Sequence, residues 1–167
     1  MVSDKYDVRG VTVIDNKMFV VFARTSKIEV YNAQTFRQLP DIRVKGMSNP
    51  CDIVACHHGG EMYIADLGGC CIWRVSIENF SFVRWLTIHT FNIWTLSLRS
   101  QRLLVTSFLP PSILLYSTAN KELLRVVELS GFVMHHAAET TRGTIVVCHE
   151  GISGGSWPWE VSENCFH

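Results

Sequence analysis

Two short stretches of the sequence hold side chains that could bind a metal ion or transfer a proton. His135 and His136 open one apolar stretch, and His149 with Glu150 ends the next one. Imidazole and carboxylate groups are ligands for transition metals, and the same groups act as general acids and bases. If the fold brings these four residues together, they form the best candidate that the chain has for a metal or acid–base site.

A second group combines Cys51 and Cys56 with the neighbouring His57 and His58. Thiolate and imidazole groups are zinc ligands, but the second Cys–His half-site of a structural zinc site is missing. The two cysteines are also five residues apart in an apolar stretch, so in a strand they would lie on opposite faces. The sequence therefore favours exposed turn histidines here, and we expect neither a metal nor another cofactor.

Aromatic residues are the candidates for a binding surface. Trp157 and Trp159 flank Pro158 after a glycine-rich loop, and Phe108 begins an apolar loop that runs to Pro111. Exposed tryptophans are frequent hot spots in protein interfaces, although this tryptophan pair is equally typical of a truncated terminus. We assign no catalytic residue, and the predicted binding residues are Trp157, Trp159, Phe108, His135, His136, His149 and Glu150.

The elements that position these residues repeat along the chain. The strongest apolar runs start at Met18, Met62, Leu103 and Thr144, which are 44, 41 and 41 residues apart. A second run starts ten residues later in the first three repeats, at Ile28, Ile72 and Ile113. Weaker runs precede and follow each pair. Four strands recurring at this period are typical of a β-propeller blade.

The sequence therefore predicts an all-β protein, a β-propeller of about four blades, each a four-stranded antiparallel sheet. We expect a single incomplete domain over residues 1–167, with repeats at about 8–49, 50–91, 92–133 and 134–167. A β-sandwich would also give short strands at regular spacing, but it does not explain why the whole four-strand unit recurs.

The second repeat carries a resemblance to a known family. Pro50-Cys51-Asp52-Ile53-Val54-Ala55, then Glu61 to Asp66, Gly68-Gly69 and Ile72-Trp73-Arg74-Val75, resembles an NHL repeat over residues 50–76. The other repeats share only the spacing and the apolar pattern, with Phe22, Ser107 and Cys148 aligned to Asp66. The WD-repeat signature is missing. The resemblance to NHL propellers of the invertebrate or tripartite-motif-like type implies six blades, and protein or RNA binding.

The NHL-like residues have expected structural roles. Tyr63 belongs to a strand that packs between blades, and Asp66 ends that strand. We expect the Asp66 carboxylate to accept hydrogen bonds from backbone N–H groups of the Leu67–Gly69 turn. Gly68 and Gly69 would supply the positive φ of a tight hairpin. The structural repeat motif comprises Pro50, Asp52, Ile53, Tyr63, Asp66, Gly68 and Gly69.

Six blades of this period need roughly 250 residues, so the chain would provide three blades and most of a fourth. We expect a third strand of the last repeat at residues 156–161, interrupted by Pro158, and no fourth strand. The chain is then a fragment of a longer protein, one half of a dimer that completes a ring, or a four-bladed ring. Open blade faces would favour self-association.

Charge and composition narrow the class of partner. The 167 residues include 15 basic and 15 acidic side chains, with no net charge and no basic cluster of the kind that binds nucleic acid. Neither a secretory signal nor a transmembrane segment is visible, so we expect a cytoplasmic protein with six reduced cysteines, among them the adjacent Cys70 and Cys71.

The hypothesis that follows is a non-catalytic binding or scaffold module that presents a propeller loop face to a protein partner. One alternative is a hydrolase or lyase of the six-bladed type, with a metal in the channel held by the histidine cluster. Another is NHL-type RNA binding, which the zero net charge disfavours. If the chain is part of a tripartite-motif-like ligase, the ligase activity lies outside it.

Overall fold

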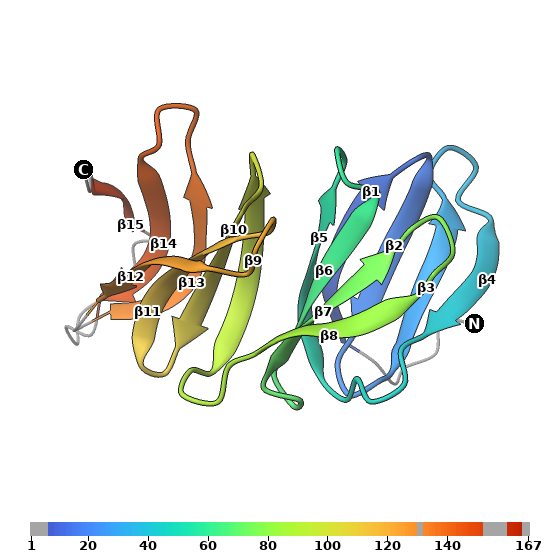
Figure 1. The fold of residues 1–167 in the computed structure, drawn as a ribbon, viewed down its shortest axis with the longest axis horizontal. Coiled ribbons are helices and arrows are strands. Elements are labelled where there is room, and N and C mark those ends of the chain that lie inside the picture. Colours follow the sequence, from blue (N-terminus) through green and yellow to red (C-terminus); the bar gives the residue numbers. More distant parts are fainter. Residues whose placement is uncertain (1–6, 130–131, 152–159, 165–167) are drawn as a thin grey trace. The chain divides into compact units, whose positions relative to one another are not determined.

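A computed structural model of the chain describes residues 7–129, 132–151 and 160–164 (Figure 1). The described residues form fifteen β-strands and no helix, in sheets whose strands pair antiparallel with their neighbours in chain order. The prediction of an all-β chain with four-stranded sheets is confirmed. No helix in the described part is long and apolar enough to cross a membrane.

The first two sheets belong to a compact unit that spans Met1–His89. Sheet 1 comprises β1 (Val8–Ile14), β2 (Lys17–Phe22), β3 (Lys27–Asn32) and β4 (Gln38–Arg43). Sheet 2 comprises β5 (Pro50–Cys56), β6 (Glu61–Asp66), β7 (Cys71–Ser76) and β8 (Phe82–Thr87).

The other two sheets belong to a second compact unit, Thr90–His167. Sheet 3 comprises β9 (Ile93–Arg99), β10 (Arg102–Phe108), β11 (Pro111–Ser117) and β12 (Leu123–Glu128). Sheet 4 comprises β13 (Phe132–Glu139), β14 (Ile145–Gly151) and β15 (Glu160–Asn164).

The last strand corrects one prediction. We expected a strand at residues 156–161, but β15 covers Glu160–Asn164 and pairs with β14 from His149 opposite Glu160 to Ile145 opposite Asn164. Proline has no N–H to donate to a ladder, and β15 begins after Pro158. Residues 152–159 lie outside the described part of the chain.

Each sheet has a β-bulge at the start of its first strand. The pairing of the first two strands shifts at Arg9 in β1, at Cys51 in β5, at Trp94 and Thr95 in β9, and at His135 in β13. A bulge leaves one extra residue outside the ladder and redirects its side chain. The four bulges therefore mark equivalent positions in the four repeats.

The bulges also fix the alignment of the repeats. The residue before each bulge pairs with Phe22, Asp66, Ser107 and His149 in turn. The sequence alignment had placed Cys148 opposite Asp66, which is wrong by one residue. The reason is that Thr144 belongs to the β13–β14 turn, where its N–H donates to Thr140 Oγ1 over 3.2 Å, so the strand starts at Ile145.

The core of the first unit lies between sheets 1 and 2. One face of sheet 1 supplies Phe19, Val21, Ile28 and Val30, and sheet 2 meets it with residues that include Met62, Ile64 and Trp73. The strands come close: a Cβ added to Gly10 of β1 would lie 2.8 Å from the Ile53 nitrogen of β5. Only glycine fits this approach without moving backbone.

The core of the second unit lies between sheets 3 and 4. Leu104 and Ile113 of sheet 3 pack with Met134, Ala137, Ile145 and Val147 of sheet 4. Residues on alternate positions of β14 share a face, so His149, which is 7% exposed, lies on this same inner face.

Candidate binding site

A pocket of about 210 Å³ opens at one end of sheets 3 and 4, within the second unit. Its lining residues are Trp94, Phe108, Val133, Met134 and His135. Four of the five are apolar or aromatic, and the imidazole supplies the polar group. Concave sites with apolar walls and few polar groups are the usual form of a binding pocket.

Strand pairing explains why these residues meet. Trp94 is the second residue of β9 and Phe108 the last of β10, and the antiparallel register sets Ile93 opposite Ser107. The start of β9 and the end of β10 therefore lie at the same edge. The Trp94 and Phe108 rings meet edge to face, with centroids 5.6 Å apart and planes at 76°, an arrangement that aromatic pairs prefer.

Phe108 also reaches solvent. Its side chain is 36% exposed, and that of Leu109 in the following turn is 61% exposed. The turn continues through a cis Leu109–Pro110 peptide bond into β11. Phe108 therefore ends β10 and lines the pocket, and the turn that follows it is apolar and exposed.

Two hydroxyl groups fix the position of His135, which forms one wall of the pocket. The buried Thr106 of β10 accepts a hydrogen bond from the Thr95 backbone nitrogen (3.1 Å), and the two hydroxyl groups are 2.5 Å apart. The Thr95 hydroxyl donates to the His135 backbone carbonyl over 3.3 Å. These contacts join the bulge of sheet 3 to the bulge of sheet 4.

The histidine cluster expected from the sequence assembles only in part. His135 Nε2 lies 3.7 Å from Glu150 Oε2, with both side chains partly exposed. His149 faces the inner side of sheet 4, whereas His136 is exposed. Among residues 7–129, 132–151 and 160–164, no three His, Cys, Asp or Glu side chains could hold a metal ion together.

Two other predicted binding residues, Trp157 and Trp159, lie outside the described residues. Trp94 is not among the predicted binding residues, because a tryptophan within an apolar strand is typical of a core position. The signal that could have identified it is its place in the repeat, where it is equivalent to Arg9, Cys51 and His135.

The NHL-like residues form a structural centre in sheet 2. The Asp66 carboxylate is fully buried and accepts hydrogen bonds from the backbone nitrogens of Ser48 (3.1 Å) and Asn49 (2.8 Å) and from the Trp73 indole (3.1 Å). Pro50 pairs with Asp66 across the ladder. The donors lie before β5 and on β7, so the expectation of donors in the Leu67–Gly69 turn is wrong.

The role of the two glycines also differs from the prediction. Positive φ occurs at Cys70 (46°) and at neither Gly68 nor Gly69. A Cβ at Gly69 would lie 2.6 Å from Asp66 Oδ2, and one at Gly68 would lie 2.5 Å from Ser48 Oγ. The glycines are thus required for space around the buried carboxylate.

The remaining members of the repeat motif are largely buried. Tyr63 is 1% exposed, and its ring meets that of Trp85 edge to face at 5.1 Å. Its hydroxyl donates to Glu61 Oε2 over 3.2 Å, and burial raises the pKa of the phenol. Ile53 packs in the core of the first unit, and Asp52 Oδ1 accepts a hydrogen bond from the Ile53 nitrogen over 2.8 Å.

The cysteines of sheet 2 should differ strongly in reactivity. The described cysteines are free thiols, and burial raises the pKa of Cys51 to about 12 and that of Cys71 to about 11. Because the thiolate is the reacting form, we expect iodoacetamide at pH 8 to label both at least about tenfold more slowly than the half-buried Cys70. Peptide mass spectrometry over time measures these rates, and equal labelling of Cys70 and Cys71 would contradict the prediction.

Comparison with known proteins identifies the fold and no closer relationship. No protein-family profile and no curated protein sequence matches the chain. Three solved structures are similar: Kuenenia stuttgartiensis hydrazine synthase (TM-score 0.75, 15% identity), the WD40 β-propeller domain of Doa1 (0.71, 13%) and the Neurospora crassa Pan2 WD40 domain (0.70, 12%).

These alignments cover 89%, 87% and 92% of this chain, and 45%, 48% and 46% of the respective structures. The chain therefore spans less than half the length of these three structures. At such low identity the similarity concerns the fold alone, and the chain lacks the WD-repeat signature. Its four-stranded antiparallel sheets and these neighbours together show that the chain has the fold of part of a β-propeller.

Proposed function

We propose that the chain is a non-catalytic binding module, which holds an apolar side chain of a protein partner in the pocket beside Trp94 and Phe108. The observation that carries the proposal is the pocket itself, with its edge-to-face aromatic pair and an exposed apolar loop at its rim. Aromatic residues around a small desolvated pocket are typical of the anchor positions in protein interfaces.

The position of the pocket supports presentation by a loop face. It lies where β9 and β13 start and β10 ends, so its lining strand residues are next to the turns that connect strands and sheets. Binding residues are commonly placed on turns that a rigid sheet scaffold supports. The zero net charge favours a protein partner over RNA.

The finer family assignment is part of the same proposal. The NHL-like residues 50–76 include Asp66, whose buried carboxylate accepts hydrogen bonds, and Gly68 and Gly69, which leave space around it. An NHL-type propeller that comprises residues 1–167 as one incomplete domain fits these contacts.

The test is peptide selection from a random displayed library on the immobilised chain. We expect the selected peptides to share an apolar or aromatic residue, and Phe108→Ala to weaken their binding by about 30-fold, as loss of an interface hot spot does. Leu123→Ala is the matched control, because Leu123 is 46% exposed in β12 of the same unit and does not line the pocket. Fluorescence anisotropy of a labelled peptide measures both affinities.

A selected peptide whose affinity is unchanged in Phe108→Ala, or is lowered equally by Leu123→Ala, would contradict the proposal. Circular dichroism of both variants shows whether the fold is retained.

A further inference from the structure

The face of sheet 1 that points away from sheet 2 is largely apolar along β1 and β2. It is open along β1, whereas Val20 of β2 is only 7% exposed. Val11 and Val13 are 50% and 46% exposed on this face. They alternate along β1 with residues such as Thr12, whose hydroxyl accepts a hydrogen bond from the Ala55 nitrogen of sheet 2. Met18 and Val20 of β2 lie opposite Val13 and Val11, because the register pairs them. A row of adjacent apolar side chains thus lies on a face that sheet 2 does not cover.

Comparison of sheet 1 with sheet 2 indicates the role of this open face. Val11 and Val20 pair in sheet 1 as Ile53 and Ile64 do in sheet 2, and Val13 and Met18 pair as Ala55 and Met62 do. All four of these residues of sheet 2 are buried in the core against sheet 1. The open face of sheet 1 is therefore equivalent to the face on which sheet 2 receives a neighbouring sheet.

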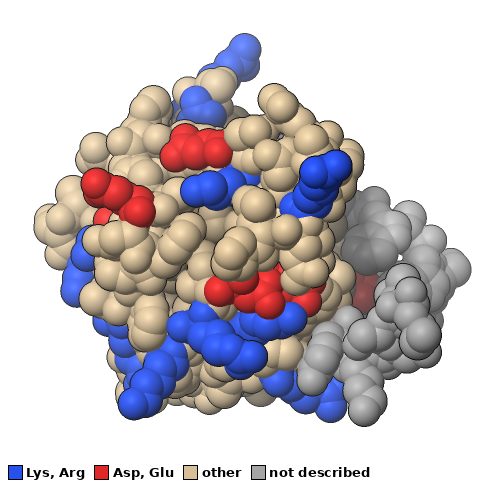
Figure 2. All heavy atoms as spheres, turned by 90° about the vertical axis from the view of Figure 1, so that its right-hand side faces the viewer, with Lys and Arg blue, Asp and Glu red and all other residues tan. Residues whose placement is uncertain are grey.

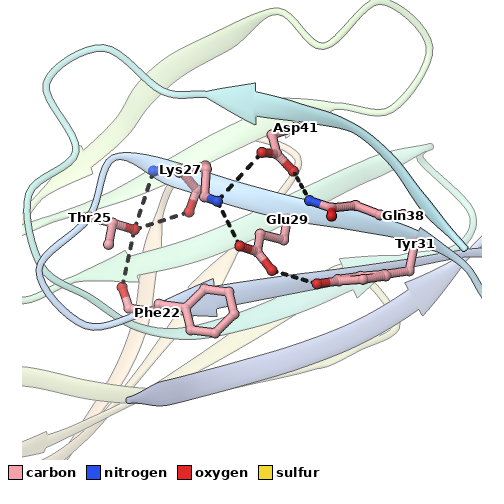
Figure 3. Close-up of polar contacts among 7 residues, drawn as sticks. All are labelled: Phe22, Thr25, Lys27, Glu29, Tyr31, Gln38 and Asp41. Atoms are coloured by element: carbon pink, nitrogen blue, oxygen red, sulfur yellow. Dashed lines mark hydrogen bonds and ion pairs between the residues drawn. The ribbon is translucent and has the colours of Figure 1, made fainter. Parts of the chain in front are cut away.

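Polar side chains occupy the other half of the open face (Figure 3). Lys27 Nζ lies 2.6 Å from Glu29 Oε1 and 3.5 Å from Asp41 Oδ2, and the Tyr31 hydroxyl donates to Glu29 Oε2 over 2.6 Å. The hydrogen bond to Glu29 raises the pKa of Lys27 and that of Tyr31. The charges of this network thus have partners within sheet 1, so a docked neighbour need not supply any.

Figure 2, which faces the side of the molecule where β3 and β4 lie, shows clusters in which acidic and basic side chains are adjacent. An apolar centre with a polar margin is the usual anatomy of a protein interface.

We propose that a second copy of this chain covers the open face of sheet 1, through the outer face of its sheet 4. That outer face carries Ala138 on β13 with Val146 and Cys148 on β14, at positions that alternate with the core residues Ala137 and Val147. His136, which pairs with Cys148, and Glu150 lie on the same face, so its small and apolar centre is bordered by an imidazole and a carboxylate.

The repeat supports a second copy as the occupant. Ala138 and Val146 pair in sheet 4 as Thr12 and Phe19 pair in sheet 1, on the face of sheet 1 that meets sheet 2, so the outer face of sheet 4 is equivalent to a face that packs on a neighbouring sheet. The contact joins two different surfaces, and such head-to-tail contacts form closed rings when the rotation between copies allows it. Two copies would use the contact twice. The inference is independent of the pocket beside Phe108.

Sedimentation-equilibrium analysis of the full chain, at concentrations up to about 0.1 mM, tests the proposal. We expect a mass of twice 19.0 kDa. The double variant Val11→Lys/Val13→Lys should weaken dimerisation by at least about a hundredfold, because it would bury two unpaired ammonium groups. Val83→Lys is the matched control, since Val83 is 46% exposed on a strand of the same unit and should leave the dimer unchanged.

Ala138→Lys tests the opposite surface of the contact and should dissociate the dimer as well. Circular dichroism of the lysine variants establishes that they remain folded. A wild-type chain that is folded and monomeric at about 0.1 mM would overturn the proposal. So would a dimer that resists the Val11/Val13 variant or that Ala138→Lys leaves intact, because the contact would then use other surfaces.

Discussion

Replacing Asp66 with alanine is expected to lower the free energy of unfolding by about 3–5 kcal/mol. The carboxylate is fully buried and accepts hydrogen bonds from two backbone nitrogens, of Ser48 and Asn49, and from the Trp73 indole. The Ser48 hydroxyl also donates to Asp66 Oδ1, over 3.4 Å, so the substitution leaves four donors without their acceptor. Each buried donor without a partner costs about 1–3 kcal/mol. Urea denaturation followed by tryptophan fluorescence measures the change.

Two further variants separate this effect from a general loss of charge. Asp66→Asn keeps one acceptor oxygen in the same shape and should cost less than Asp66→Ala. Asp7→Ala removes a carboxylate that is 71% exposed and has only an ion pair with Arg9 at 3.5 Å, so we expect a change within about 0.5 kcal/mol. If Asp66→Ala were as mild as Asp7→Ala, the hydrogen bonds of Asp66 would not stabilise the fold.

The partners of Asp66 show where inference from sequence ends. Its burial at a strand end follows from the repeat pattern, whereas its donors Ser48 and Asn49 lie 18 and 17 residues earlier in the chain. The sequence suggested donors in the adjacent turn because local hydrogen bonds are the ones that spacing can predict. A contact between a strand end and the loop that enters the sheet depends on tertiary packing.

The glycines Gly68 and Gly69 illustrate the same limit. Paired glycines in a hairpin suggest positive φ, yet the left-handed residue of this turn is Cys70. What excludes larger residues is the approach of Ser48 and of the Asp66 carboxylate. Sequence spacing contains no information on such an approach until the neighbouring loop is placed.

The strands themselves were predictable because apolar runs repeat at a nearly constant distance. The alignment failed by one residue only in the last repeat, because Thr144 belongs to the turn before β14 and not to the strand. The bulge at His135 establishes the correct register of this repeat.

The same bulge also explains the pocket, because it directs the His135 side chain to the pocket wall beside Trp94 and Phe108. A bulge depends on pairing between strands, so the sequence predicted Phe108 and His135 separately and did not predict that they meet.

The second large effect is expected at Thr106, which supports this bulge. Thr106→Val keeps the shape of the side chain and removes the hydroxyl that accepts from the Thr95 nitrogen and contacts the Thr95 hydroxyl. We expect a loss of about 1–3 kcal/mol in the free energy of unfolding, since the partly buried Thr95 N–H loses its acceptor. The Thr95 hydroxyl holds the His135 carbonyl, so peptide binding in the pocket should weaken as well.

Thr106→Ser restores the hydroxyl and should recover binding, although it removes a buried methyl group at a cost of about 1 kcal/mol. Thr118→Val is the matched control, because the Thr118 hydroxyl donates to the Gln101 carbonyl in an exposed turn and should change stability by less than about 0.5 kcal/mol. Denaturation and peptide titration of the three variants distinguish two roles for Thr106. If Thr106→Val and Thr106→Ser bind peptide equally, the hydroxyl chain does not position His135. If only Thr106→Val loses binding, the bulge couples the packing of sheets 3 and 4 to the shape of the pocket.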